Sequence, residues 1–136
     1  MIYLPKTRLR IAGLIFLIML FLLAGMNHFS NPNFYVSIMP PYLPLQTELA
    51  YIAGILEVLG AVGLLFARTR RMAGYSLIIL LVIIFPANIH MAVYPEYFPH
   101  YSPFSIYLRL PLQFMFISWV YWAAVRNKAR GDYEMY

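Results

Sequence analysis

The chain has 136 residues, of which 62% are hydrophobic and only 11% are charged. Soluble domains carry roughly a quarter charged residues, so this composition predicts a protein whose solvent is the lipid bilayer. The chain has no cysteine, which excludes disulfide relays, thiol catalysis and iron–sulfur ligation. Its net charge of +5 does not indicate nucleic-acid binding, because nine of its ten basic residues flank apolar runs in three short clusters. We therefore expect a single membrane domain over residues 1–136.

The first apolar run follows a short basic leader, residues 1–10. It predicts a membrane-spanning helix over residues 9–27. The alternative is the core of a cleavable secretory signal. That core is usually about 7 to 15 residues long and ends in an A-x-A-like site. The run here is longer and Ala24-Gly25-Met26 is a poor cleavage site, so we expect the helix to be retained.

A loop rich in aromatic residues and proline is predicted over residues 28–46, because its four prolines exclude a long helix. Its many apolar side chains favour a position in the interfacial layer of the membrane, where tyrosine rings are enriched. The loop is then either an aromatic anchor or a lid over a cavity, with Pro40, Pro41 and Tyr42 as the lid residues. A second loop of the same kind covers residues 94–103.

Three further spanning helices are predicted at about residues 47–67, 72–93 and 104–125. The cluster Arg68-Thr69-Arg70-Arg71 is expected to form the turn between the second and the third. Pro86 lies inside the third helix and leaves the carbonyl of Val82 without its helical partner, which predicts a kink.

The basic clusters predict the orientation of the chain. All three lie at the leader, at the turn after the second helix and in the tail, whereas the two aromatic loops hold no lysine or arginine. The positive-inside rule therefore predicts that both termini are cytoplasmic and that both loops face outward. The expected fold class is an all-α integral membrane protein, an up-down-up-down four-transmembrane-helix bundle. The expected location is a bacterial inner (plasma) membrane.

Polar residues gather in the outer half of the predicted bundle. At a rise of ~1.5 Å per residue, Glu57 and Gln113 lie roughly 14 Å below the outer helix ends, and Arg109 and Asn88 roughly 8 Å. Four more polar residues are expected at the mouth of this region: Asn27, His28, Glu48 and His90. A carboxylate at the depth of Glu57 costs about 2.5 to 3.5 kcal/mol or more, so it needs a partner. Arg109 is one candidate, directly or through Gln113, and protonation of Glu57 is the alternative.

Each of these residues also has a structural interpretation. Arg109 can snorkel to the outer surface, and His28 and His90 can act as interfacial anchors. Asn88 can satisfy carbonyls freed by Pro86. No metal site is expected, because asparagine and arginine dominate the set. The chain has no dinucleotide, phosphate-loop or nucleophile motif, and we identify no self-contained catalytic or redox centre in it.

Four segments of the chain resemble the DoxX-like family of small four-helix membrane proteins. They are the Pro40-Pro41-Tyr42 loop, the run around Glu57, residues 85–90 (FPANIH) and residues 109–113 (RLPLQ). The resemblance covers about residues 9–122. It implies the four-helix fold and a polar pocket. Relatives in that family are small subunits of thiosulfate:quinone oxidoreductases, members of other membrane redox complexes, or an assembly chaperone for ligand-gated ion channels.

Two functions follow as expectations. In the first, Glu57, Asn88, Arg109 and Gln113 form the polar end of a pocket that takes a quinone or a lipid, and the chain serves as a small subunit of an oxidoreductase complex. Quinone would be its only cofactor. In the second, the chain is an assembly chaperone or accessory subunit, and its helix faces contact a membrane-protein partner or a second copy. A channel is a weaker third idea, because the inner half of the bundle is closed by aliphatic side chains.

Overall fold

The computed structural model describes residues 4–5, 7–126 and 133–134. Four helices are long and apolar enough to cross a membrane, and the predicted all-α class is confirmed. In chain order the elements are β1 (Leu4–Pro5), α1 (Arg8–Ser30), α2 (Pro32–Ile38), α3 (Gln46–Leu65), α4 (Ala67–Val93), the 3-10 turn η1 (Pro95–Tyr97), α5 (Pro103–Val120), the π-helical turn η2 (Tyr121–Val125) and β2 (Tyr133–Glu134). The basic residues Lys6, Lys128 and Arg130, on which part of the predicted orientation rests, lie outside the described residues.

Proline residues begin two of the helices. Pro32 starts α2 and Pro103 starts α5, where the missing N–H is one that a helix leaves unpaired anyway. The hydroxyl of Ser102 caps α5 by accepting a hydrogen bond from the backbone N–H of Ser105 at 3.2 Å. The first aromatic loop therefore contains a seven-residue helix, α2, which holds part of the loop in place.

The junction between α3 and α4 differs from the expected basic turn. The chain changes direction at Phe66 alone, and the predicted turn residues 68–71 belong to the start of α4. Arg70 explains the difference. Its guanidinium Nε donates to the carbonyl of Leu64 at 2.8 Å, and its Nη2 donates to that of Leu65 at 3.1 Å. A cation thus caps the carbonyls that α3 leaves free at its C-terminus.

Arg10 plays the same part at the end of η2. It donates from Nε to the carbonyl of Ala123 at 3.2 Å and from Nη2 to the carbonyl of Arg126. The side chains of Arg10 and Arg70 are buried. Two residues expected only to mark the cytoplasmic side are therefore also helix caps within the fold.

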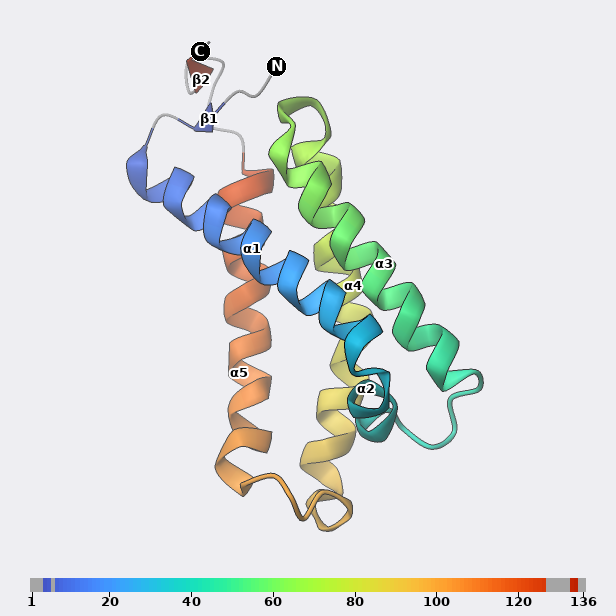
Figure 1. The fold of residues 1–136 in the computed structure, drawn as a ribbon. Coiled ribbons are helices and arrows are strands. Elements are labelled where there is room, and N and C mark those ends of the chain that lie inside the picture. The colour runs from blue at the N-terminus through green and yellow to red at the C-terminus, as the bar shows by residue number, and fades with distance from the viewer. Residues whose placement is uncertain (1–3, 6, 127–132, 135–136) are drawn as a thin grey trace.

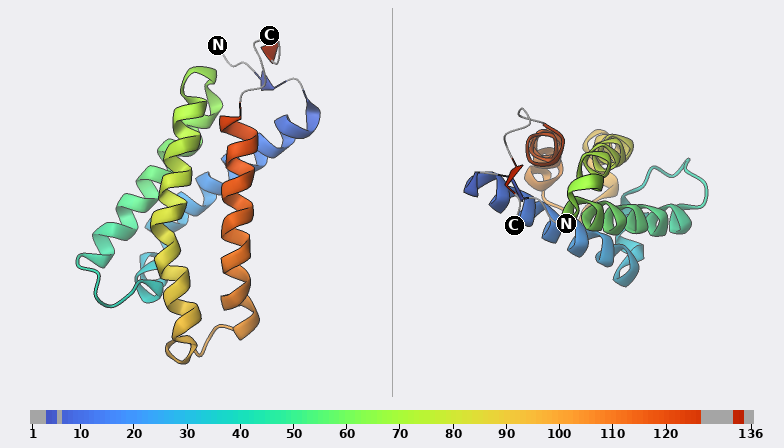
Figure 2. Two further views of the ribbon diagram at one scale, coloured as in Figure 1. Left: turned by 180° about the vertical axis from the view of Figure 1, so that it is seen from behind. Right: turned by 90° about the horizontal axis from the view of Figure 1, so that it is seen from above.

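Consecutive long helices run in opposite directions, and α1 lies obliquely across the others (Figures 1 and 2). Packing is mainly between neighbours in the chain: α1 on α3, α3 on α4, and α4 on α5. α1 meets α5 near η2. One end of the molecule holds β1, β2 and the α3–α4 junction, and we call it the strand end (Figure 1). The opposite end holds α2 and η1, and we call it the loop end.

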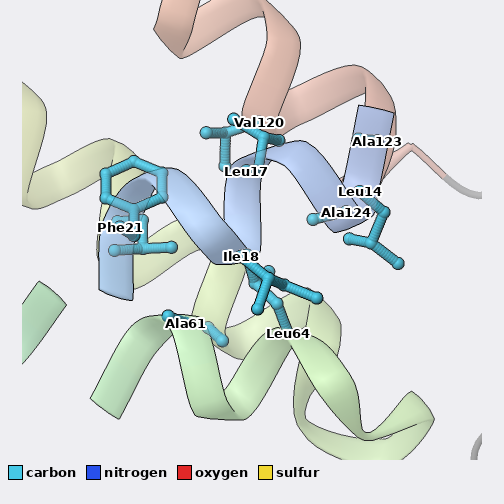
Figure 3. Packing of buried hydrophobic residues seen from close by; sticks show 11 residues of the cluster. Leu14, Leu17, Ile18, Phe21, Ala61, Leu64, Val120, Ala123 and Ala124 are labelled. Atoms are coloured by element: carbon cyan, nitrogen blue, oxygen red, sulfur yellow. The ribbon is translucent and has the colours of Figure 1, made fainter. Parts of the chain in front are cut away.

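Two apolar cores occupy the two ends. The larger core lies toward the strand end, where α1 passes between α3 and the end of α5 (Figure 3). Its buried members are Leu14, Leu17, Ile18, Phe21, Ala61, Leu64, Ala73, Leu77, Val120, Ala123 and Ala124. The smaller core lies at the loop end and consists of Ile38, Met91, Phe98 and Ile106. Along the helices, the other four buried polar side chains fall between these two cores: His28, Glu57, Asn88 and Gln113.

Candidate functional site

Glu57 is buried, with 6% of its surface exposed, and its partner is a histidine on α1. The Nε2 atom of His28 lies 3.5 Å from the Oε2 atom of Glu57, and His28 is 4% exposed. We call these two residues the acid–imidazole pair. It is the one ion pair within 4.0 Å that the described part of the chain contains.

Two glycines bring α1 and α3 close enough for this pair. A Cβ atom on Gly54 would lie 2.6 Å from the Cβ of His28 and 2.9 Å from the carbonyl oxygen of Gly25. A Cβ on Gly25 would in turn lie 2.9 Å from the carbonyl oxygen of Gly54. The backbones therefore touch at this crossing, which is the small-residue packing typical of membrane helices.

The expected pairing of Glu57 with Arg109 is wrong. The depths were counted as if all four helices stood upright and had their outer ends at the same level in the membrane. That count placed His28 at the pocket mouth, well above Glu57. Because α1 is oblique, its last turn instead lies against the middle of α3, and His28 reaches the carboxylate first. Within the described residues, the contacts of Arg109 are with Met91 and two aromatic rings.

Tyr35 of α2 covers the acid–imidazole pair. Its ring stacks on the imidazole of His28, with the ring centroids 3.5 Å apart and the planes 17° from parallel. The side-chain amide of Asn27 donates a hydrogen bond to the Tyr35 hydroxyl at 2.8 Å and holds the ring there. Burial raises the pKa of Tyr35 above its usual value, against the lowering effect of the Asn27 hydrogen bond, and the nearby Glu57 raises it further.

The sequence pattern did not single out Tyr35 as a site residue. One signal was available: a tyrosine just after a helix that ends in Asn27-His28 can fold back on that helix end. The expected lid residues lie elsewhere. Pro40 is buried and accepts a hydrogen bond on its carbonyl from the Gln46 side chain at 3.0 Å, whereas Tyr42 is 74% exposed.

Two polar atoms of the acid–imidazole pair have unused hydrogen-bonding capacity. Among the described residues, neither His28 Nδ1 nor Glu57 Oε2 has a hydrogen-bond partner, and both atoms are buried. Most buried polar atoms in proteins are hydrogen-bonded. Two neighbouring buried atoms without a hydrogen-bond partner, one on an acid and one on a base, therefore need an explanation. Together these atoms can donate and accept hydrogen bonds.

Asn88 and Gln113 form a second polar pair, between α4 and α5. The Asn88 amide donates to Gln113 Oε1 at 2.6 Å, and the Gln113 amide donates to the carbonyl of Leu81. That carbonyl lies next to the one that Pro86 leaves without a helical donor. We call this the amide pair. Both side chains are buried, and they meet although the residue count placed Gln113 deeper than Asn88.

The remaining predicted residues do not join either pair. The ring of His90 lies beside those of Tyr94, at 5.1 Å, and Phe98, at 6.1 Å, and so belongs to the loop-end aromatic cluster. Glu48 is exposed in the first turn of α3. Within residues 4–5, 7–126 and 133–134, no three histidine, aspartate or glutamate side chains come together as a metal site would require.

A family model described as "Domain of unknown function (DUF8561)" matches residues 17–124, so the chain belongs to this family. The match includes all of the acid–imidazole pair, its tyrosine cover and the amide pair. No curated protein matches the chain. No solved structure matches it either.

Proposed function

We propose that this DUF8561 member is an integral membrane protein that binds the head group of a quinone at the acid–imidazole pair, beneath Tyr35. The observation that carries the proposal is that two buried atoms, His28 Nδ1 and Glu57 Oε2, have no hydrogen-bond partner among the described residues, although Oε2 lies 3.5 Å from His28 Nε2. A quinone carbonyl accepts a hydrogen bond and a quinol hydroxyl donates one, which suits a site that combines an imidazole with a carboxyl group. The DoxX-like resemblance of the chain supports the same ligand class.

Entry to the site requires Tyr35 to move. The cover is a single ring on a seven-residue helix, held by one side-chain hydrogen bond from an exposed asparagine. Rotation of α2 away from α1 would uncover the imidazole without disturbing the strand-end core. We therefore assign the lid role to α2 and Tyr35. The apolar tail of the ligand would lie along the exposed aliphatic faces of the long helices, as in sites that combine apolar walls with few polar groups.

Any redox reaction of this quinone would take its electrons from a partner protein, since quinone reduction needs two electrons and two protons. The acid–imidazole pair would serve proton transfer. On this proposal the chain is a small subunit of a membrane oxidoreductase complex. The runner-up function, an assembly chaperone or accessory subunit, draws on the exposed apolar side chains of α1, among them Leu23 and Met26, which a partner helix could cover.

Binding of decylubiquinone to the purified protein in lipid nanodiscs tests the proposal. We expect Glu57→Gln and His28→Phe each to weaken binding at least tenfold. Glu96→Gln makes the same chemical change on an exposed residue of η1 and should leave binding unchanged. Equal binding by wild type and both site variants would overturn the proposal, as would no binding by the wild type. In that second case a stoichiometric protein that co-purifies would favour the accessory role.

The proposed orientation, with both termini cytoplasmic and the loop end outside, has a direct test because the chain has no cysteine. A membrane-impermeant maleimide applied to intact cells should label Glu96→Cys and leave Thr7→Cys unlabelled until the cells are lysed. Both replaced residues are exposed, so burial does not explain a difference. The reverse labelling pattern would invert the orientation.

A further inference from the structure

Arg109 is a cation that the quinone site does not use. It lies on α5, two turns from the helix start at Pro103, within a segment apolar enough to cross a membrane. Its guanidinium carbon lies 5.5 Å from the ring centre of Tyr101 and 6.0 Å from that of Phe34. Its Nη1 atom lies 3.8 Å from the sulfur of Met91. Three uncharged groups from three parts of the chain therefore surround one charge.

No carboxylate among the described residues lies within 4.0 Å of this charge. The one acid–base contact within that distance in the described part of the chain is His28–Glu57. Aromatic faces and a thioether attract a guanidinium weakly compared with an anion. The planar fork of an arginine is suited to hold a phosphate through two parallel hydrogen bonds. The arrangement thus lacks one component, an anion.

The position of the guanidinium indicates where that anion comes from. Side chains on a helix lean toward its N-terminus, so Arg109 points toward the loop end, where Tyr101 precedes α5. Tyrosine and arginine side chains at a membrane boundary lie at the level of the lipid head groups. Beside Arg109 on α5, the apolar side chains of Phe104 and Leu108 are exposed and can contact acyl chains.

We propose that Arg109, flanked by Tyr101 and Phe34, binds the phosphate of an anionic phospholipid from the outer leaflet. The inference rests on the membrane insertion proposed above but not on the quinone site. The guanidinium binds two phosphate oxygens. The site favours a lipid with net negative charge because the described residues supply no carboxylate within 4.0 Å of Arg109.

The test is binding of palmitoyl-oleoyl phosphatidylglycerol to the delipidated protein, followed by native mass spectrometry, with the phosphatidylcholine of the same chains as reference. We expect Arg109→Gln to weaken phosphatidylglycerol binding at least tenfold and to abolish the preference over phosphatidylcholine. Arg109→Lys keeps the charge but loses the fork, and should weaken binding by a smaller factor. The matched control is Arg71→Gln, which removes an exposed arginine that lies 5.9 Å from the ring of Tyr75 at the strand end and should change binding less than twofold.

Each other outcome overturns the inference. Equal losses of phosphatidylglycerol binding in Arg109→Gln and Arg71→Gln would mean that the lipid is attracted to the positive charge of the protein in general and not to a site at Arg109. Full competition by inorganic phosphate at millimolar concentration would mean that the ligand is a free anion and not a lipid. If Arg109→Gln loses a co-purifying protein while its lipid binding is unchanged, the anion that pairs with Arg109 is a carboxylate of that partner protein. Decylubiquinone binding should be normal in Arg109→Gln, and phosphatidylglycerol binding normal in Glu57→Gln, so that failure of either proposal is distinguishable from failure of the other.

Discussion

The two buried polar pairs occupy similar places in the fold and differ in chemistry. Both lie between the strand-end and loop-end cores, and both join two neighbouring helices. In the amide pair every contact closes within the protein, because Asn88 donates to Gln113 and Gln113 donates to a backbone carbonyl. In the acid–imidazole pair the two side chains are ionisable, lie 3.5 Å apart and leave two buried atoms unpartnered.

This difference separates a packing role from a chemical one. A neutral pair whose observed hydrogen bonds all end on protein atoms fixes how two helices meet, and among the described residues it contains no buried atom without a partner. An acid and a base with unused hydrogen-bonding capacity, under a ring that Asn27 and the carbonyl of Ala24 hold through the Tyr35 hydroxyl, can accept a further molecule. The comparison therefore predicts that changes at the acid–imidazole pair affect both ligand binding and stability, and that changes at the amide pair affect stability alone.

The largest effect is expected from removing one member of the acid–imidazole pair. His28→Leu leaves the buried carboxyl group of Glu57 without its partner and should lower the free energy of unfolding by about 3 kcal/mol or more. The double variant His28→Leu/Glu57→Leu replaces both groups by apolar ones and should recover most of that loss. The measurement is unfolding in mixed micelles with increasing SDS. Additive losses in the double variant would contradict an interaction between the two residues.

A smaller effect is expected at the amide pair. Asn88→Leu leaves Gln113 Oε1 buried without its donor, which should cost about 1 to 3 kcal/mol. The same SDS titration measures it. Decylubiquinone binding by Asn88→Leu should match that of the wild type, which would distinguish the amide pair from the acid–imidazole pair. A loss of binding equal to that of Glu57→Gln would mean that the two pairs form one site.

Removal of the Tyr35 hydroxyl should have a smaller effect again. Tyr35→Phe loses the hydrogen bond from Asn27 at a partly exposed position and should destabilise the protein by about 0.5 to 1 kcal/mol. It should also speed decylubiquinone association, measured by stopped flow, because the cover opens more often. Tyr42→Phe removes a hydroxyl from an exposed tyrosine in the same loop and is the control. Equal rates in the two variants would place the lid elsewhere.

The smallest effect concerns alkaline pH. The raised pKa of Tyr35 means that the folded protein holds the phenolic proton more tightly than the unfolded chain does. This contribution is fully present below the unfolded pKa, about 10, and is lost as the pH rises through the folded value. The thermal midpoint of the wild type, relative to that of Tyr35→Phe, should therefore fall between pH 9 and pH 11. A relative midpoint that stays constant or rises would show that the cover is not buried.

Local signals predicted the helices well, and the reasons are local. Long apolar runs specify the four candidate spans, whereas α2, which Pro32 begins, lies in a segment predicted as a loop. Counting residues placed Asn88 and Gln113 in the same half of the bundle but on levels about 6 Å apart, so their hydrogen bond was not predicted. The basic turn was misplaced because nothing local indicates that Arg70 folds back onto the end of α3.

The partner of Glu57 was not predictable by such counting. By itself the sequence determined that this chain is helical and apolar, and that one carboxylate lies deep within it, because these properties follow from composition and period. Only the tertiary structure decided which base reaches that carboxylate. The choice depends on the oblique crossing of α1 over α3 at Gly25 and Gly54, and the angle between two helices is a property of their packed surfaces together.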